Sequence, residues 1–171
     1  MTLSAAFATT SPLWVRSWLS AEYVVDDDLV LCVSAGADRA RVRVNVSVEC
    51  AADWFDCYVG VDGRAEYAAE VKRILERTPS LYLSAALPSA VVGTARLTVI
   101  DDVAVLSCMA VRPEARRQGI ARALISAARD AARERDVVAI GLQVVASNTP
   151  ARALYAAAGF AEADGYHYRV R

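Results

Sequence analysis

The residues from Arg116 to Arg122 could bind a phosphorylated ligand. In this segment a basic run is followed by a glycine and a small residue, at the point where an apolar run ends and a helical pattern begins. The first N–H groups of a helix have no acceptor within the helix and can bind phosphate oxygens, and arginine side chains add charge-assisted hydrogen bonds. The pattern Arg116-x-x-Gly119-x-Ala121 therefore predicts a pyrophosphate site. The spacing alone fits an ordinary basic first turn of a surface helix equally well.

A second group of candidate residues follows an apolar segment farther along the chain. Asn148 stands at the end of that segment, and Tyr155 lies seven residues later. Seven residues make about two turns of helix, so both side chains can point to one ligand. Taken singly, Asn148 is also typical of a turn or a helix cap, and Tyr155 of a core aromatic residue with its hydroxyl at the surface.

Other kinds of site find no support in the sequence. Neither the Gly-x-x-x-x-Gly-Lys-Ser/Thr pattern nor the Gly-x-Gly-x-x-Gly pattern of nucleotide binding is present. The four cysteines show no Cys-x-x-Cys spacing, and the single histidine, His167, cannot build a zinc site with them at any recognised spacing. We therefore expect no metal, and we expect the cysteines to be reduced, buried thiols.

Length and composition narrow the class of protein. The 171 residues allow one domain with a sizeable core. No segment approaches the roughly 20 apolar residues of a membrane helix, and residues 1–12 lack the positive charge that opens a signal peptide. The net charge of −1 gives no general preference for nucleic acid, and no aromatic residues are interleaved with the local arginines. We expect a cytoplasmic protein that binds neither nucleic acid nor membrane.

The elements that must position these residues change in character along the chain. Residues 1–12 are expected to form a flexible tail, and residues 13–62 an atypical, strand-rich part. Within that part, two β-prone pieces flank an expected turn at Asp26-Asp27-Asp28. Valine alternates with polar residues over 41–49, which predicts a half-buried strand with its valines facing inward. A helical turn is expected over 53–58.

From residue 63 on, the pattern becomes helix, three strands, helix, strand, helix and strand. The expected elements are a helix at 63–77 with Tyr67, Val71, Ile74 and Leu75 on one face, strands at 81–86, 91–100 and 103–111, a helix at 117–135 with Ile120, Leu124, Ala128 and Ala131 facing inward, a strand at 137–146, a short helix capped by Thr149 with Pro150 at its first position, and a strand at 166–170. Asp101-Asp102 predicts a hairpin between two of these strands. The order indicates an α/β (α+β) fold with helices packed on a sheet, and residues 13–171 as a single domain.

Taken together, these segments resemble the GNAT superfamily of acetyl-coenzyme A-dependent N-acyltransferases. The matching features are, in order, the apolar strand at 105–111, Arg112-Pro113, the Arg116-x-x-Gly119-x-Ala121 turn, and Asn148-x-x-Ala151-x-x-Leu154-Tyr155-x-x-x-Gly159-Phe160. The resemblance covers about residues 64–171. It implies the acyl-CoA N-acyltransferase fold, a mixed central sheet with helices on both faces, whose acetyl-CoA-binding core is residues 63–171.

The resemblance also implies a role for each candidate residue. The end of the strand at 103–111 would meet the pantetheine arm of acetyl-CoA like an added strand, and the turn would hold the pyrophosphate. A strand beginning near Val138 would diverge from it and leave room for the thioester. Asn148 would bond the cofactor arm, and Tyr155 would donate a proton to the departing thiolate or stabilise it. The cofactor-binding positions are Met109, Ala110, Val111, Arg116, Arg117, Gln118, Gly119, Ile120, Ala121, Arg122, Asn148 and Tyr155, and Tyr155 is also the catalytic candidate.

The implied reaction transfers an acetyl group to a primary amine of a small molecule, peptide or protein by direct attack. A backbone N–H near Met109 or Ala110 would polarise the thioester carbonyl. Related N-terminal alanine acetyltransferases of ribosomal proteins carry a glutamate at the position of Gln143, and glutamine cannot act as a base. The alternatives for the base are a water chain, Asp101, Asp102, Glu162, Asp164 or His167, although a structural role suits His167 better, or the amine arrives neutral.

The N-terminal part is a second departure from the family pattern. Single-domain members have a first strand and two helices before their central strands, whereas residues 13–50 are rich in strand patterns. This part faintly resembles the end of the first, degenerate domain of two-domain bacterial members, and an incomplete half would expose a sheet edge. We therefore expect a homodimer, with strand exchange as one form. A non-catalytic acyl-CoA sensor or partner-binding subunit on the same fold is the alternative function.

Overall fold

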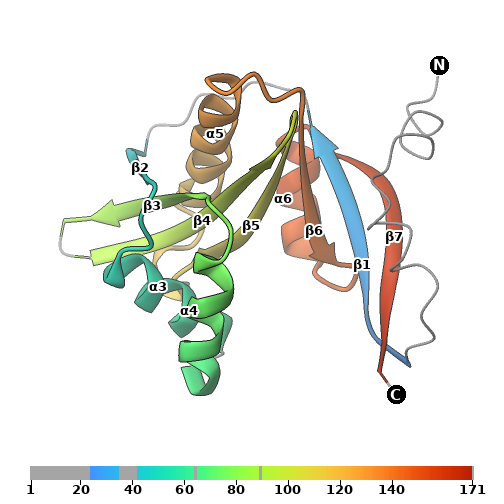
Figure 1. The fold of residues 1–171 in the computed structure, drawn as a ribbon, viewed down its shortest axis with the longest axis horizontal. Coiled ribbons are helices and arrows are strands. Elements are labelled where there is room, and N and C mark those ends of the chain that lie inside the picture. The colour runs from blue at the N-terminus through green and yellow to red at the C-terminus, as the bar shows by residue number, and fades with distance from the viewer. Residues whose placement is uncertain (1–23, 35–41, 64, 89, 171) are drawn as a thin grey trace.

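In the part of the chain that the structure describes, seven strands form one sheet that carries helices on both faces (Figure 1). The computed structural model describes residues 24–34, 42–63, 65–88 and 90–170, so the tail expected at 1–12 lies outside the described residues. The strands are β1 (Val24–Ser34), β2 (Val44–Ser47), β3 (Leu81–Leu87), β4 (Ala90–Ile100), β5 (Val103–Val111), β6 (Ala139–Val145) and β7 (Ala161–Val170); the helices are α3 (Ala52–Asp62), α4 (Ala68–Glu76), α5 (Ile120–Arg133) and α6 (Thr149–Ala157).

The strands lie in the order β2-β3-β4-β5-β6-β1-β7. β5 and β6 pair in parallel, and the other neighbours pair antiparallel. A parallel pair needs a crossover connection, and α5 supplies it between β5 and β6. The sheet is therefore mixed, as expected, and the predicted hairpin of β4 and β5 is confirmed.

Each face of the sheet has its own core. Helices α3 and α4 lie on one face, and α5 and α6 on the other (Figure 1). Alternating residues of β3 show the division: Leu83 joins the large core with α5, whereas Tyr82 packs with Trp54 of α3 and Leu75 of α4. The two rings of Trp54 and Tyr82 meet edge to face, with centroids 5.0 Å apart. This alternation is what period-two side chains of a strand impose.

Helix α5 buries the face that the sequence predicted. Ile120, Leu124, Ala128 and Ala131 recur at helical spacing, and all four are buried in the large core. The helix starts at Ile120 rather than at residue 117, because the residues before it form a turn with left-handed backbone. This turn carries the residues predicted to bind pyrophosphate.

The turn predicted at Asp26-Asp27-Asp28 is wrong. β1 runs unbroken from Val24 to Ser34, and the register of its pairing with β7 shifts between Val25 and Asp28. Aspartates favour turns, but here the β-prone residues on both sides pair with the same neighbouring strand. β1 also pairs with β6, so a strand from the N-terminal part of the chain lies between β6 and β7.

Three other expectations for this region need correction. The strand predicted at 41–49 is the short edge strand β2, and its valines do not all face inward. Val46 is 42% exposed because β2 borders the sheet, and Val48, beyond the end of β2, is 74% exposed. The helical turn expected at 53–58 is the full helix α3. The helix expected at 63–77 is divided into a 3₁₀ turn and α4. Of its predicted apolar face, Leu75 is buried and Val71 half-buried, whereas Tyr67 and Ile74 are exposed.

β2, α3 and α4 therefore supply a first strand and two helices before the central strands. The N-terminal part departs from the family pattern less than the sequence suggested, and the extra element is β1. Among the residues that the structure describes, no helix combines the length and apolar character needed to span a bilayer.

Candidate functional site

β5 and β6 separate in the middle of the sheet. They pair in parallel from Val103 opposite Ala139 to Leu106 opposite Leu142, and beyond that point each strand continues without pairing to the other. We call the two diverging ends, residues 107–111 of β5 and 143–145 of β6, the strand fork (Figure 1). The divergence predicted from the resemblance is confirmed. Backbone groups of β5 on this side are not bonded to β6, so an extended ligand could pair with them.

A β-bulge lies in β5 where the strand fork begins. The register of β4 shifts between Thr94 and Arg96, so Cys108 and Met109 oppose a single residue. Cys108 has a φ of 53°, a left-handed conformation that few residues other than glycine adopt. Its carbonyl accepts a hydrogen bond of 3.1 Å from the buried hydroxyl of Thr94, which holds the bulge in place. The bulge interrupts the regular ladder where the thioester carbonyl was expected to lie.

The turn after β5 has the backbone shape of an anion site. A 3₁₀ turn at Pro113–Ala115 leads to Arg117 and Gly119, whose φ values are 64° and 80°. The N–H of Ala123 donates to the carbonyl of Gly119 (3.0 Å), so the N–H groups of residues 120–122 precede the first helical hydrogen bond. The first turn of α5 contains no acidic residue to offset the positive end of the helix dipole.

Glycine is needed at position 119 for its backbone conformation. A Cβ placed there would meet no atom within 4 Å, so nothing in the protein crowds the position, but its φ of 80° strains other residues. Arg116, Arg117 and Gln118 are exposed beside it. The open space leaves the turn accessible to a ligand.

Two side chains brace this turn, one against the preceding strand and one against the 3₁₀ turn. Nε of Arg116 donates to the carbonyl of Val111 (3.2 Å), and Nε2 of Gln118 donates to the carbonyl of Glu114 (3.2 Å). Arg116 therefore contributes to the shape of the site as well as to its charge. One backbone acceptor that was predicted to meet the pantetheine arm, the Val111 carbonyl, already bonds to Arg116.

Gly93 brings the sheet close to the start of α5, and the sequence interpretation did not include it. A Cβ at Gly93 would lie 2.5 Å from Cγ2 of Ile120 and 3.2 Å from Cδ1 of Leu124. Only glycine lets α5 begin at this distance from β4. A glycine inside a strand pattern is itself a signal of close backbone approach, so the sequence held an indication of this contact.

Asn148, rather than Thr149, caps helix α6. Its Oδ1 accepts a hydrogen bond of 3.2 Å from the N–H of Ala151, so the helix begins at Thr149 and Pro150 is its second residue rather than its first. The hydroxyl of Thr149 instead contacts the carbonyl of Ser147 at 3.5 Å. Asparagine is among the strongest N-cap residues, so the cap is sufficient reason for Asn148 to be there. Donation to a cofactor would fall to the amide nitrogen.

Tyr155 lies buried on α6, packed against Phe160. The ring centroids are 5.8 Å apart in an edge-to-face arrangement, and 7% of the residue is exposed. Burial, with a smaller effect of the Cys32 thiol, raises the pKa of Tyr155 to about 12. The phenol is therefore protonated at neutral pH and can donate a hydrogen bond.

The comparison with family models shows to which family this chain belongs. The model of the Acetyltransferase (GNAT) family matches residues 48–160, more than half of the chain. The chain belongs to this family. Members of the family use acetyl-CoA, and the strand fork and the open turn of this GNAT chain fit an extended arm that ends in a pyrophosphate.

Relatives of known structure share the fold. The [ribosomal protein bS18]-alanine N-acetyltransferase of Escherichia coli (strain K12) is 45% identical over 65 residues, which are 38% of this chain and 44% of the relative. The crystal structure of the ribosomal-protein-S18-alanine N-acetyltransferase from Escherichia coli matches with a TM-score of 0.61 and 27% identity, over 71% of this chain and 80% of that one.

A tandem GNAT protein from the clavulanic acid biosynthesis pathway matches with a TM-score of 0.68 over 92% of this chain and 57% of its own. Its identity of 14% shows a likeness of fold alone. The GNAT chain spans less than half the length of the curated relatives it matches.

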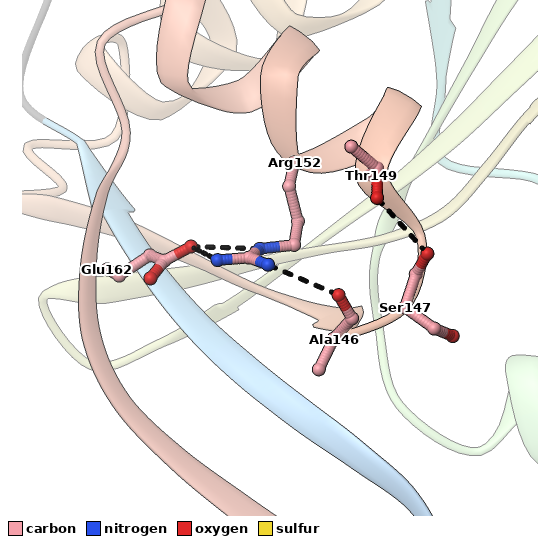
Figure 2. A network of polar contacts seen from close by, with 5 residues as sticks. All are labelled: Ala146, Ser147, Thr149, Arg152 and Glu162. Atoms are coloured by element: carbon pink, nitrogen blue, oxygen red, sulfur yellow. Dashed lines mark hydrogen bonds and ion pairs between the residues drawn. The ribbon is translucent and has the colours of Figure 1, made fainter.

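Arg152 joins three segments of this GNAT chain around α6 (Figure 2). Apart from its place in the motif, no sequence pattern predicts this role. Its Nε and Nη2 donate to Oε1 of Glu162 at 2.9 and 2.5 Å, and its Nη1 donates to the carbonyl of Ala146 at 3.2 Å. The side chain thus connects the end of β6, the first turn of α6 and the start of β7.

The structure separates the candidate bases of the GNAT chain. Asp101 and Asp102 form the turn between β4 and β5, six residues before Cys108. Six residues of extended strand span about 20 Å, so neither carboxylate reaches the strand fork. Glu162 forms a hydrogen-bonded ion pair with Arg152. The side chains of Asp164 and His167 lie outside the described residues.

Gln143 is exposed on β6 within the strand fork. Its neighbours Leu142 and Val144 are buried, so Gln143 lies on the opposite face of the sheet from the α5 core. Glutamine there can donate and accept hydrogen bonds without taking a proton.

Other kinds of site find little support around the strand fork. In the described part of the GNAT chain, no three His, Cys, Asp or Glu side chains are grouped to hold a metal ion. Two surface hollows of about 370 and 280 Å³ lie beside β2, and neither includes a residue of the strand fork or the turn. The candidate site consists of the edge of β5 that is not paired with β6 and the first turn of α5.

Proposed function

We propose that this chain transfers an acetyl group from acetyl-CoA to a primary amine of a small molecule, peptide or protein. The observation that carries the proposal is the strand fork leading directly into the open N-terminus of α5. The amides of an extended thioester arm can pair with residues 109–111 as an added strand would. The pyrophosphate would then meet the backbone and side chains of residues 116–122.

The residues around the strand fork suit direct transfer. Backbone N–H groups beside the bulge at Cys108 would polarise the thioester carbonyl. The amine nitrogen forms a C–N bond as the C–S bond breaks; the amine loses one proton to water or a base, and the departing sulfur gains one. Tyr155 would donate a hydrogen bond to that sulfur, and Asn148 would bond the arm. The printed name of the Escherichia coli relative supports a peptide or protein amine among these acceptors.

Calorimetry with acetyl-CoA tests the donor half of the proposal. We expect wild-type protein to bind acetyl-CoA and Gly119→Trp to lose binding, because the indole would occupy the space in front of the turn. Gly63→Trp is a matched control, since Gly63 also has a left-handed φ (76°) and open space around it, and it lies at the end of α3. Absence of binding by the wild type at millimolar acetyl-CoA would refute the proposal.

A non-catalytic acyl-CoA sensor is the second candidate, and Gln143 in the strand fork favours it. A sensor would bind acetyl-CoA but release no thiol with any amine. Thiol release measured across a panel of amines, including peptides with a free N-terminus, separates the two functions. Release that depends on one class of amine also identifies the acceptor.

We further propose a cytoplasmic homodimer that binds neither nucleic acid nor membrane. β2 and β7 end the sheet, and in the described part of the chain each pairs with one neighbour. Such edges favour pairing with another copy. The four cysteines are free thiols, which suits a reducing compartment, and the net charge is −1. Sedimentation as a monomer at micromolar concentration would contradict the dimer.

A further inference from the structure

The contacts of Arg152 cross the strand that lies between β6 and β7. Cys32 of β1 pairs with Leu142 of β6 on one side and with Glu162 of β7 on the other. Two strand spacings separate β6 from β7, about 10 Å. One guanidinium, carried by α6, bonds to the carbonyl of Ala146 just past β6 and to Glu162 on β7 (Figure 2). Arg152 therefore spans β1 on the face of the sheet that carries α6.

The same side chain lies between the two proposed ligand-contacting residues of α6. Asn148 caps the helix four residues before Arg152, and Tyr155 follows three residues after it. Residues at these spacings are neighbours on a helix surface. The Cys32 thiol adds to the raised pKa of Tyr155. The pKa of Cys32 is itself raised, mainly by burial and to a smaller degree by Glu162, while Arg152 acts to lower it. These side chains thus form one cluster.

The geometry of this ion pair suits positioning better than stabilisation. The side chains of Arg152 and Glu162 are 38% and 53% exposed, and exposed pairs contribute little to folding stability. Two N–H groups of the guanidinium converge on one carboxylate oxygen while a third binds a backbone carbonyl. This planar set of donors fixes the orientation of the side chain, and a lysine ammonium cannot reproduce it.

We propose that Arg152 is a positioning residue for the acyl-transfer site. With Glu162 and the Ala146 carbonyl, it holds the first two turns of α6 on β1 and β7 and so fixes Asn148 and Tyr155 relative to the strand fork. Its effect on catalysis rests on the proposed function. Its effect on the order of α6 does not.

Three variants test the proposal in the full chain: Arg152→Met, Glu162→Gln and Arg152→Lys. We expect the turnover number to fall at least about 10-fold in each, because a displacement of about 1 Å at a reacting group can cost up to about 100-fold. The dissociation constant for acetyl-CoA should change less than about twofold, since residues 116–122 are untouched. Amide exchange over 146–157 should become faster. Combining Arg152→Met with Glu162→Gln should cost little more than Arg152→Met alone, because Arg152→Met already removes the contact with Glu162.

Glu70→Gln is the matched control. Glu70 forms an exposed ion pair with Arg73 on α4 at 3.3 Å, three residues apart on one helix. We expect wild-type turnover and exchange in this variant. Unchanged exchange over 146–157 in Arg152→Met overturns the positioning role whether or not the chain is an enzyme. Turnover equal to that of Glu70→Gln also overturns it. A wild type that binds acetyl-CoA but never releases thiol refutes the proposed function instead, and leaves the exchange result to decide the role of Arg152.

Discussion

At the scale of single residues, the environment of Tyr155 restricts what it can do. Its pKa of about 12 lies well above that of a thiol, which is near 8.5 in cysteine. Complete proton transfer from this phenol to a departing thiolate is therefore uphill by roughly three pKa units. A hydrogen bond to the sulfur has no such cost. Tyr155 is better suited to stabilise the thiolate while water supplies the proton.

This assignment predicts the pH dependence of Tyr155→Phe. A tyrosine donor works in its protonated form, so activity falls as pH rises through its pKa. Since burial raises that pKa to about 12, wild-type turnover should stay level up to pH ~10.5, where an ordinary tyrosine near pKa 10 would already be ionised. Tyr155→Phe should lower turnover about 10-fold or more at every pH, with acetyl-CoA binding nearly unchanged. Steady-state rates at saturating substrates and calorimetry measure both. Lost binding would instead make Tyr155 structural.

Two substitutions separate the role of Asn148 as a helix cap from its proposed role in binding the cofactor arm. Asn148→Ala removes the N-cap acceptor and should lower the free energy of unfolding by about 1 kcal/mol. Asn148→Asp keeps an acceptor for the Ala151 N–H, but it cannot donate. If the amide nitrogen bonds the cofactor arm, Asn148→Asp should fold like the wild type and bind acetyl-CoA more weakly. Denaturation and calorimetry on the two variants separate the roles. Wild-type affinity in Asn148→Asp would leave the cap as its only function.

At the scale of elements, the sequence predicted what depends on near neighbours. The hairpin at Asp101-Asp102 and the apolar face of α5 follow from local turn chemistry and helical period, and both are confirmed. The place of β1 does not follow, because Leu29 pairs with Val145, more than 100 positions away. The exposure of Val46 has the same cause: alternation predicts a strand, whereas only the sheet order shows that the strand is an edge.

The contact of β4 with α5 predicts that Gly93→Ala impairs both folding and cofactor binding. The new methyl would lie 2.5 Å from Ile120, the first residue of α5, and must displace the start of the helix. Overpacking of this kind costs about 1–3 kcal/mol of unfolding free energy. We expect a matching loss of acetyl-CoA affinity, measured by calorimetry, because residues 120–122 move with the helix.

Gly60→Ala is the control for this change. Gly60 lies in α3 with nothing near its Cβ position, so alanine there should raise stability by roughly 0.5–1 kcal/mol. Equal behaviour of the two variants would show that Gly93 does not set the position of α5.

At the scale of the whole molecule, β1 makes the sheet continuous. The family model covers residues 48–160, so β1 lies outside the matched range. Yet β1 is a central strand, bonded to β6 through 29–34 and to β7 through 24–33. Without β1, β7 would have no neighbour in the described sheet. Arg152, which spans β1, would then bridge two unconnected strands. We therefore expect the arrangement of the candidate site to depend on β1, a strand outside the family-matched region.

A single proline in β1 tests this dependence. Leu31 pairs with Gln143 on one side and Asp164 on the other, so its N–H lies within a ladder whichever way it faces. Leu31→Pro removes that donor from a central strand and should lower the unfolding free energy by at least about 2 kcal/mol more than Leu31→Ala, which changes the side chain but keeps the N–H. Urea denaturation measures the difference, and amide exchange should show β6 and β7 opening together in the proline variant. A proline variant as stable as the alanine variant would place Leu31 outside any ladder and remove β1 from the centre of the sheet.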